Sequence, residues 1–503
     1  MDLSPLFPEL LLLGLAILVL VIDWFLPKGK KSALGYIAII GVVLIILLVH
    51  LAYGTKFFPG AAELFFNFNN NPMVFQGFVV DAFAVFFKKI FLLALGVVFI
   101  YSSFFFKNKG ENQGEYYALM IFVAMGCSLL VSSSDLLLFF VSFELMSIPL
   151  YLLAGFSKRD SRSNEAGLKY FLIGAITSAI LLYGISLIYA SLGTTDLRRL
   201  VAPGPINLFH LQSDPVLLIG VIFVLSGLAF KIAAAPFHMW VPDVYEGAPT
   251  PVVSFLAVGP KIAVIGFILR IFISSMPESE PLWTLYFAIL SALSMTMGNL
   301  MALHQTNLKR LLAYSGVAQI GYILLGVAAI QAPTPIAPAS VQIGYQAVLF
   351  YLVAYALTEL TAFGVVTYLG SMGRETVESC QGLARTSPGL AFIFMLSLFS
   401  LAGIPPLIGF VGKFYLFAAA FQKQLYWLVI LGILNSVVAL FYYFRIASSM
   451  YFKKEKEETS FIAYAPIQAT LWVIGLTLLI IGVYPKTVID LAQSALQRFL
   501  VGF

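Results

Sequence analysis

The sequence is dominated by apolar stretches of about 20 residues, and this pattern restricts the fold more than any other feature. A helix needs about 20 apolar residues to cross the roughly 30 Å of hydrocarbon in a bilayer. Fourteen stretches reach this length, approximately at residues 5–26, 33–52, 78–105, 115–133, 135–156, 165–192, 215–240, 248–274, 281–303, 306–330, 341–370, 387–421, 424–451 and 465–485. Backbone groups inside a bilayer must bond within the protein. The stretches therefore predict an all-α polytopic membrane protein with about 14 transmembrane helices.

The composition agrees with a protein surrounded by lipid. The chain has 503 residues, of which 60% are hydrophobic and 11% are charged, whereas about 25% of the residues of a soluble domain are charged. The longest segments between the apolar runs, roughly 53–77 and 193–214, are too short for a soluble catalytic domain. We interpret the net charge of +5 as a property of membrane-surface loops, with no nucleic acid as a partner.

Cofactor motifs are absent from the sequence. It contains no Cys-x-x-Cys cluster, Walker loop, dinucleotide fingerprint or paired haem-ligating histidines. Cys127 and Cys380 lie in or beside different apolar runs, without metal-binding spacing. We expect no cofactor, no metal and no directly bound soluble substrate in this chain, so any electrons must be handled by other proteins.

Four ionisable side chains interrupt apolar runs. Glu144 lies in LLLFFVSFELMSIPLYLLAGF, Lys231 in GLAFKIAAAPFHMW and Lys261 in VVSFLAVGPKIAVIGFILRIF, while Lys413 lies in LSLFSLAGIPPLIGFVGKFYLF. A charge at the bilayer centre costs about 2.5–3.5 kcal/mol on insertion scales. A lysine–glutamate pair stabilises both charges, and separating the pair lets the lysine release its proton. These residues therefore predict proton-carrying sites, although static ion pairs that fix helix packing are the alternative.

Prolines predict that the seventh and twelfth helices are interrupted near their lysines. Pro236 should kink or break the seventh helix, and Pro405 and Pro406 should interrupt the twelfth more severely. Irregular backbone at membrane depth lies within protein or lines a hydrated cavity. Two broken helices five positions apart suggest two inverted five-helix repeats. The predicted segments are 1–110 with three helices, 111–275 with helices four to eight, 276–452 with helices nine to thirteen, and 453–503 with the fourteenth helix.

Two further buried groups have open roles. His238 follows Lys231 by two helical turns if the helix persists, and it could relay protons or simply be a hydrogen-bonded interfacial histidine. Glu359 could link the two repeats, or it could hydrogen-bond to Thr358 or Thr361 as a packing feature.

Basic residues in the loops predict the orientation, because cytoplasmic loops are enriched in lysine and arginine. The odd-numbered loops contain Lys28, Lys30, Lys31, Lys107, Lys109, Lys158, Arg159, Arg162, Lys309, Arg310, Arg374, Arg385, Lys453, Lys454 and Lys456. The other side contains Lys56, Arg198, Arg199, Arg270, Lys423, Lys486 and Arg498. Both termini are therefore expected in the periplasm of a bacterial cell, with the chain in the inner membrane. Lys88 and Lys89 are expected to snorkel from one end of the third helix, although Lys88 could lie deeper.

Three long motifs resemble a known family. FKIAAAPFHMWVPDVYEGAPTPVVSFLAVGPKIA, NLKRLLAYSGVAQIGY and SLAGIPPLIGFVGKFYLF are similar to the antiporter-like membrane subunits of proton-pumping NADH–quinone oxidoreductase, respiratory complex I. The likeness extends from about the fourth helix to the thirteenth. PDVYEGAP, the length near 500 residues and the lysine at 413 resemble subunit N most, since subunit M has glutamate at that place.

The resemblance implies two inverted five-helix repeats and roles for individual residues. It implies that Glu144 is the partner of Lys231, that Lys261 is the connecting lysine, and that Lys413 exchanges protons with the periplasmic side. It also implies membrane-arm subunits as partners, with flavin, iron–sulfur clusters and quinone bound in other subunits. A multi-subunit cation/proton antiporter and a structural membrane anchor of a redox complex are the alternative functions.

Overall fold

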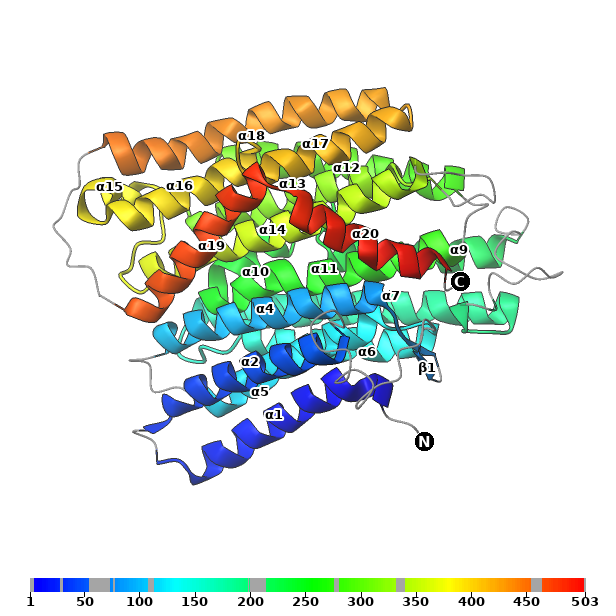
Figure 1. Cartoon of the computed structure of the whole chain (residues 1–503), viewed down its shortest axis with the longest axis horizontal. Coiled ribbons are helices and arrows are strands. Elements are labelled where there is room, and N and C mark those ends of the chain that lie inside the picture. Colours follow the sequence, from blue (N-terminus) through cyan, green and yellow to red (C-terminus); the bar gives the residue numbers. More distant parts are fainter. Residues whose placement is uncertain are drawn as a thin grey trace.

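The computed structural model of the chain is a bundle of long helices that run roughly alongside one another (Figure 1). The structure describes residues 4–27, 30–53, 73–75, 77–106, 113–197, 199, 214–275, 280–331, 340–453 and 464–501. The predicted boundary between residues 110 and 111 lies outside these residues, as do Met1 and Phe503.

The helices and strands follow one another along the chain in a single series. They are η1 (Ser4–Leu6), α1 (Phe7–Phe25), α2 (Ala33–Tyr53), β1 (Met73–Phe75), β2 (Phe78–Val80), α4 (Ala82–Phe105), α5 (Gln113–Val131), α6 (Leu136–Ala154), α7 (Ser161–Leu192), α9 (Pro215–Lys231), α10 (Val241–Gly247), α11 (Thr250–Ser275), α12 (Glu280–Leu303), α13 (Leu308–Ala328), α14 (Ser340–Gly370), η5 (Glu378–Cys380), α15 (Leu383–Thr386), α16 (Pro388–Ala402), α17 (Ile408–Gln422), α18 (Tyr426–Phe452), α19 (Ala465–Val483) and α20 (Lys486–Val501).

The prediction of an all-α polytopic membrane protein is confirmed. Among the described residues, 12 helices are long and apolar enough to cross a membrane, and α9, α16 and α17 are shorter apolar helices. The helix α9 is the first part of the predicted seventh helix, while α16 and α17 form the predicted twelfth. Both helices are broken where the prolines predicted an interruption.

The middle of the bundle is formed by α11, α13 and α14. The apolar window of α11 is 100% buried and that of α13 is 94% buried, whereas the windows of α1 and α2 are each 33% buried. The helix α11 packs against α4, α5 and α14, so it joins the early helices to the later ones (Figure 1). Lys261 lies on this central helix, remote from lipid.

The two predicted five-helix groups pack in matching ways. In the first group, α5 packs on α6 and on α11; in the second, α12 packs on α13 and on α18. The third helix of each group, α7 or α14, packs against the broken helix that follows it. An odd number of helices per group makes equivalent helices cross the bundle in opposite directions if every helix crosses it, which is what the predicted inverted repeat requires. The exact segment boundaries remain a prediction.

The first break is stabilised by hydrogen bonds from neighbouring elements. Pro236 has no backbone N–H, so it cannot donate the hydrogen bond that a continuous helix would use at this position. The Ala235 N–H donates to Ser294 Oγ of α12 at 2.9 Å. The Trp240 indole N–H donates to the Phe230 carbonyl at 3.3 Å. Backbone groups released by the break thus find partners inside the protein, which is the condition for irregular backbone at membrane depth.

The second break depends on glycine. Gly403 ends α16 with a φ of +88°, a left-handed conformation that favours glycine, and Pro405 and Pro406 follow it. A Cβ on Gly409 would lie 1.9 Å from the Ser400 carbonyl oxygen, so only glycine fits where α17 starts beside α16. The Gly409 N–H donates to Ser400 Oγ at 3.2 Å.

Three features differ from the sequence-based expectation. The third membrane helix begins at Ala82 instead of residue 78, because Asp81 caps α4 by accepting a hydrogen bond from the Ala84 N–H. The preceding residues form the antiparallel hairpin β1–β2. After α19, a further helix, α20, packs across α4 and α14 (Figure 1). The expected apolar run ended before α20, whose sequence is amphipathic.

Candidate functional site: a line of buried ionisable groups

Lys231 ends α9 in a polar and aromatic environment. Its Nζ donates to Ser147 Oγ at 2.7 Å and to the Tyr170 hydroxyl at 3.2 Å. The ammonium also lies 5.2–5.3 Å from the ring centroids of Phe143, Tyr151 and Tyr170. Aromatic faces attract a cation, so these groups stabilise the charge of a lysine that is 2% exposed. No carboxylate contacts it directly in the described structure.

Glu144 lies on α6, one turn before Ser147. The direct Glu144–Lys231 ion pair expected from the sequence is not formed, because Lys231 bonds Ser147 and Tyr170 instead. The two charges still interact electrostatically. The Glu144 Oε1 atom is buried without a hydrogen-bond partner. The Glu144 carboxylate therefore interacts with the Lys231 ammonium without a direct contact, and its Oε1 atom accepts no hydrogen bond.

Lys261 lies at the centre of α11 and is 1% exposed. Its Nζ donates to the Tyr355 hydroxyl of α14 at 3.5 Å and lies 5.6 Å from the ring centroid of Tyr245 on α10. It also interacts electrostatically with Glu359 of α14. Thus α10, which follows the first break, and α14 of the second group both contact this lysine.

Glu359 is fully buried, and both of its carboxylate oxygens lack hydrogen-bond partners. The alternative that it hydrogen-bonds to a neighbouring threonine is wrong. Thr358 Oγ1 donates to the Ala354 carbonyl, and Thr361 Oγ1 donates to the Leu357 carbonyl. A buried carboxyl without hydrogen bonds is costly, which makes a purely packing role a poor explanation for it.

Lys413 on α17 reaches back to the end of α16. Its Nζ donates to the Leu401 carbonyl at 2.9 Å and to the Ala402 carbonyl at 3.2 Å. The ammonium lies 4.1 Å from the ring centroid of Tyr322. The carbonyl end of a helix carries partial negative charge. The broken helix therefore provides a cation site at membrane depth, and no carboxylate of the described residues forms an ion pair with Lys413 there.

Gln319 on α13 connects the Lys413 site with Glu359. Its Nε2 donates to the Leu401 carbonyl at 2.9 Å, the same oxygen that accepts from Lys413. Its Oε1 accepts a hydrogen bond from the Tyr351 hydroxyl, and Tyr351 interacts electrostatically with Glu359. The sequence reasoning did not identify this glutamine, although an amide inside an apolar run was a usable signal.

His238 is buried, but the premise that placed it above Lys231 is wrong. The helix does not persist, since α9 ends at Lys231 and His238 lies in the following turn. Its Nδ1 is buried without a hydrogen-bond partner, and its ring centroid lies 6.3 Å from that of Tyr314. No hydrogen bond joins His238 to Lys231 in the described residues.

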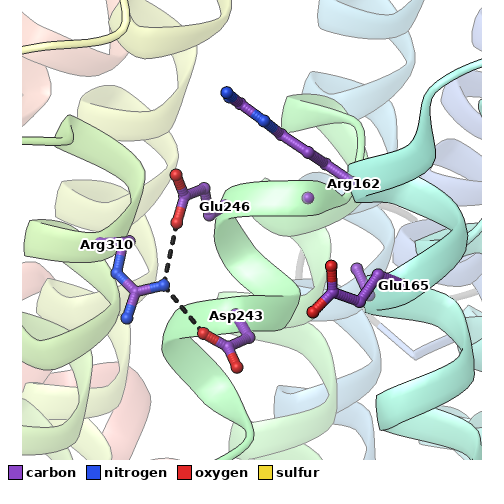
Figure 2. A pocket seen from close by; sticks show the side chains of 7 residues that line it. Arg162, Glu165, Asp243, Glu246 and Arg310 are labelled. Atoms are coloured by element: carbon purple, nitrogen blue, oxygen red, sulfur yellow. Dashed lines mark hydrogen bonds and ion pairs between the residues drawn. The ribbon is translucent and has the colours of Figure 1, made fainter.

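An ionic cluster outside this line fixes α10 to its neighbours (Figure 2). Asp243 of α10 bonds Lys169 of α7 at 2.8 Å and Arg310 of α13 at 2.8 Å. Arg310 also bonds Glu246 at 2.9 Å. The cluster borders a polar cavity of about 210 Å³ lined by Arg162, Glu165, Ala166, Asp243, Glu246, Gly247 and Arg310. Since α10 carries Tyr245, this cluster also positions the ring beside Lys261.

Two buried ion pairs were not anticipated. Lys88 does not snorkel: it is 1% exposed and its Nζ lies 2.8 Å from Glu9 Oε1. Arg270 is not a loop residue, because its guanidinium is fully buried and binds both oxygens of Asp81 at 2.9 Å. Each pair joins residues far apart in the sequence, so neither partner could be assigned from sequence alone.

Clusters of side chains that could bind a metal ion are not found in the described part of the chain. There, no three histidine, cysteine, aspartate or glutamate side chains come together in a way that could hold a metal ion. Cys127 and Cys380 are buried free thiols.

Comparisons with known proteins agree with this geometry. Residues 133–439 match the family described as NADH:quinone oxidoreductase/Mrp antiporter, TM. A NADH-quinone oxidoreductase subunit N from Trichlorobacter lovleyi is 39% identical over 99% of this chain and 97% of its own length. A chain of respiratory complex I from Thermus thermophilus superposes with a TM-score of 0.76 at 31% identity, covering 96% of this chain and 98% of that one. A chain of the Mrp complex from Dietzia has the same fold, with a TM-score of 0.79 at 22% identity and coverage of 98% and 97%.

The fold and its buried charges define an antiporter-like polytopic membrane protein. The chain belongs to the NADH:quinone oxidoreductase/Mrp antiporter transmembrane family, and the predicted likeness to subunit N is confirmed.

Proposed function

We propose that this chain moves protons across the membrane as a subunit of a proton-pumping NADH–quinone oxidoreductase, driven by quinone reduction in another part of the complex. The main support is a line of ionisable groups, which are buried on α9, α11, α14 and α17 and half-buried on α6, joined by hydroxyls and one amide. Such groups inside a membrane protein characteristically mark ion or proton routes. The full-length likeness to subunit N supports the choice of complex.

Each residue takes a role that its contacts support. Glu144 tunes Lys231 electrostatically, and Lys231 passes its proton to Lys261. Tyr170, bonded to Lys231, and Tyr245, beside Lys261, lie between the two lysines and interact electrostatically with each other. A lysine that alternates between charged and neutral forms can both accept and release the proton.

The second half of the route runs from Lys261 to Lys413. Glu359 accepts the proton from Lys261 and so links the two five-helix groups. Gln319 connects the surroundings of Glu359 to the Lys413 site. Lys413 delivers the proton to the outer side. His238, with a buried unpaired ring nitrogen, supplies protons from the cytoplasmic side of the first break.

Electron transfer belongs to partner subunits in this proposal. Flavin, iron–sulfur clusters and quinone are bound there, and this chain contacts other membrane-arm subunits and lipid. The exposed leucine, isoleucine and valine side chains of α1, α2 and α7 provide apolar surface for both kinds of neighbour. The chain itself transfers protons only.

We further propose a bacterial inner-membrane location with both termini in the periplasm. The basic residues of the loops support this orientation. Arg270, Lys309 and Arg374 are buried, so they no longer belong among the basic loop residues. Of the residues counted, Lys28, Lys56, Lys107, Lys109, Arg198, Lys454 and Lys456 lie outside the described residues, as does the side chain of Arg498.

A Lys231→Ala substitution tests the function. Complex containing this chain is reconstituted in vesicles, and acidification is compared with the electron-transfer rate. We expect pumping to fall by about 10²-fold or more, the usual effect of removing a proton-transfer group, while the complex still assembles. Lys158→Ala, an exposed lysine in a loop, is the control and should pump normally. Normal pumping by both Lys231→Ala and Glu144→Ala would favour the structural-anchor alternative.

The second candidate is a subunit of a multi-subunit cation/proton antiporter. The family description includes such antiporters, and the Mrp chain shares the fold. Purification through a tag on this chain separates the two. Copurifying flavin, iron–sulfur clusters and NADH oxidation support the first candidate, whereas sodium-dependent proton exchange without them supports the second.

A further inference from the structure

A buried ion pair in the first helices is not used by the proton line described above. Lys88 Nζ of α4 lies 2.8 Å from Glu9 Oε1 of α1, and the two side chains are 0% and 4% exposed. Ser128 Oγ of α5 donates to the same Glu9 oxygen at 2.7 Å. The other carboxylate oxygen, Oε2, is buried without a hydrogen-bond partner. The pair therefore joins three helices and leaves one strong acceptor unused.

The pair differs chemically from the other buried ion pair of this region. Arg270 binds both oxygens of Asp81 and also donates to the Val131 carbonyl. An arginine does not lose its proton in a protein, and the bidentate geometry satisfies the carboxylate. Lysine, in contrast, can lose its proton when buried. The Arg270–Asp81 pair is therefore a static ion pair, whereas a proton can pass between Lys88 and Glu9.

Polar groups lead from this pair toward one end of the bundle. Glu9 lies in the first turn of α1 and Ser128 in the last turn of α5, so both are near the end at which α1 starts. Ser132 and Ser134 follow in that direction, and their hydroxyls are buried without partners. Buried hydroxyls normally bond protein or water, so these two can hold waters. Phe78 of β2 lies over Lys88, with its ring centroid 4.9 Å from Nζ.

The helix α5 brings the Glu9–Lys88 pair close to the proton line around Lys231. Cys127 precedes Ser128 on α5 and interacts electrostatically with Lys231. The helix α5 thus separates the Lys231 site on one side from the Glu9–Lys88 pair on another. The remaining charged groups near the pair on α4 are Asp81, which Arg270 neutralises, and Lys89, which is partly exposed.

We propose that Glu9 and Lys88 form an additional proton-exchange site, which connects the first five-helix group with the membrane side where α1 begins. Lys88 transfers a proton to Glu9, giving a neutral amine and a neutral carboxyl group. The carboxyl group then releases the proton to water along Ser132 and Ser134, and Lys88 is reprotonated from the Lys231 side. This inference rests on the proposed proton-pumping function and adds a release route that does not use Lys413.

A Lys88→Arg substitution distinguishes proton exchange from a static pair. Arginine retains the positive charge and the partner of Glu9, but it cannot release a proton at this site. In reconstituted complex we expect normal NADH oxidation and a clear loss of pumped protons per NADH. Lys89→Arg, the same change one residue later at a partly exposed position, should pump normally. Unchanged pumping in Lys88→Arg overturns the proposal.

An infrared measurement keeps the test decisive if the arginine variant does not assemble. During turnover, the native complex should show the carbonyl band of a protonated carboxyl group that is missing in Glu9→Gln. A static pair stays ionised and gives no such band, so identical difference spectra for the two proteins also overturn the proposal. The Lys231→Ala variant separates this result from the main function. Normal pumping by Lys231→Ala would reject the proposed pumping function. If Lys231→Ala loses pumping while Lys88→Arg and Glu9→Gln behave as the native complex, only the additional site is rejected.

Discussion

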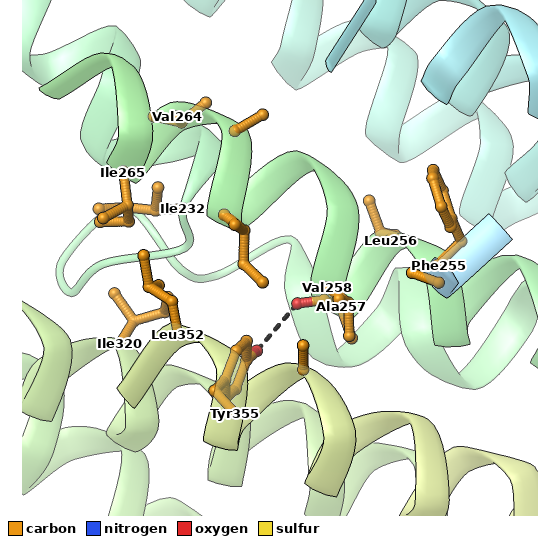
Figure 3. Close-up of a cluster of buried hydrophobic side chains, with 14 of the residues drawn as sticks. Ile232, Phe255, Leu256, Ala257, Val258, Val264, Ile265, Ile320, Leu352 and Tyr355 are labelled. Carbon is orange, nitrogen blue, oxygen red and sulfur yellow. Dashed lines mark hydrogen bonds between the residues drawn. The ribbon is translucent and has the colours of Figure 1, made fainter. Parts of the chain in front are cut away.

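The Tyr355 hydroxyl of α14 lies 3.5 Å from Lys261 Nζ of α11. It also donates a 2.9 Å hydrogen bond to the Ala257 carbonyl, one turn before the lysine (Figure 3). The phenol thus contacts both the backbone and the charged end of the central helix. Apolar side chains of α11 and α14 lie beside it, including Val258 and Leu352 (Figure 3). In such surroundings a single hydroxyl has a large effect on where a buried ammonium lies.

Tyr355→Phe should impair pumping more than stability. The phenylalanine keeps the packed ring and loses a hydrogen bond worth about 0.5–1.5 kcal/mol. Lys261 loses the hydroxyl that accepts its hydrogen bond, so transfer between the two five-helix groups should slow. Thermal unfolding of the purified complex and vesicle acidification measure the two effects separately. A Tyr355→Phe complex that pumps at the native rate would show that the hydroxyl is not part of the route.

Gly316→Ala should displace Lys261 without damaging the fold. A Cβ on Gly316 would lie 3.1 Å from Lys261 Nζ, so the flexible end of the lysine must move by a few tenths of an ångström. Alanine is also favoured over glycine inside a helix by about 1 kcal/mol. We therefore expect an assembled, equally stable complex with slower pumping. Gly14→Ala is the matched control, because nothing lies within 4 Å of its added Cβ; equal pumping by the two variants would contradict the prediction.

The broken helices were predictable because their causes are local. Pro236 removes a backbone donor, and Pro405 and Pro406 do so next to glycines. Proline alone does not decide a break, since Pro149 and Pro260 lie inside the continuous helices α6 and α11. A lysine inside an apolar run is equally visible in sequence. The sequence therefore located Lys231, Lys261 and Lys413, as well as the interruptions beside two of them.

The partners of the charged groups were not predictable, because they depend on which helix faces meet. Glu144 was expected to contact Lys231, but Ser147, one turn later on the same helix, makes the contact. Glu9 and Lys88 lie on different helices, and only the packed structure brings them together. The amphipathic α20 and the short β1–β2 hairpin lacked the long apolar runs on which the prediction depended.

Ser147 and Glu144 should therefore have different effects on Lys231. Ser147→Ala removes a 2.7 Å hydrogen bond to the ammonium, and hydrogen bonds to charged groups contribute about 1.5–3 kcal/mol. Glu144→Gln removes an electrostatic interaction but no contact. We expect Ser147→Ala to lower the thermal stability of the complex more, and Glu144→Gln to lower pumping more. The double variant measures how strongly the two positions are coupled; the reverse order of effects would mean that a direct ion pair forms in the working protein.

Substitutions of Lys413 should distinguish the effect of its positive charge from the effect of its proton release. Its ammonium bonds the last carbonyls of α16, Leu401 and Ala402, at the second break. Lys413→Met leaves these carbonyls without the cation, at a cost of about 1–3 kcal/mol, and should lower both stability and pumping. Lys413→Arg keeps a permanent cation beside the same carbonyls, so it should preserve more of the stability while abolishing release through this residue. Lys423→Arg, at the end of α17 where Glu280 pairs with the lysine, is the control and should pump normally. Rapid pumping by Lys413→Arg would mean that Lys413 acts only as a positive charge at the helix end.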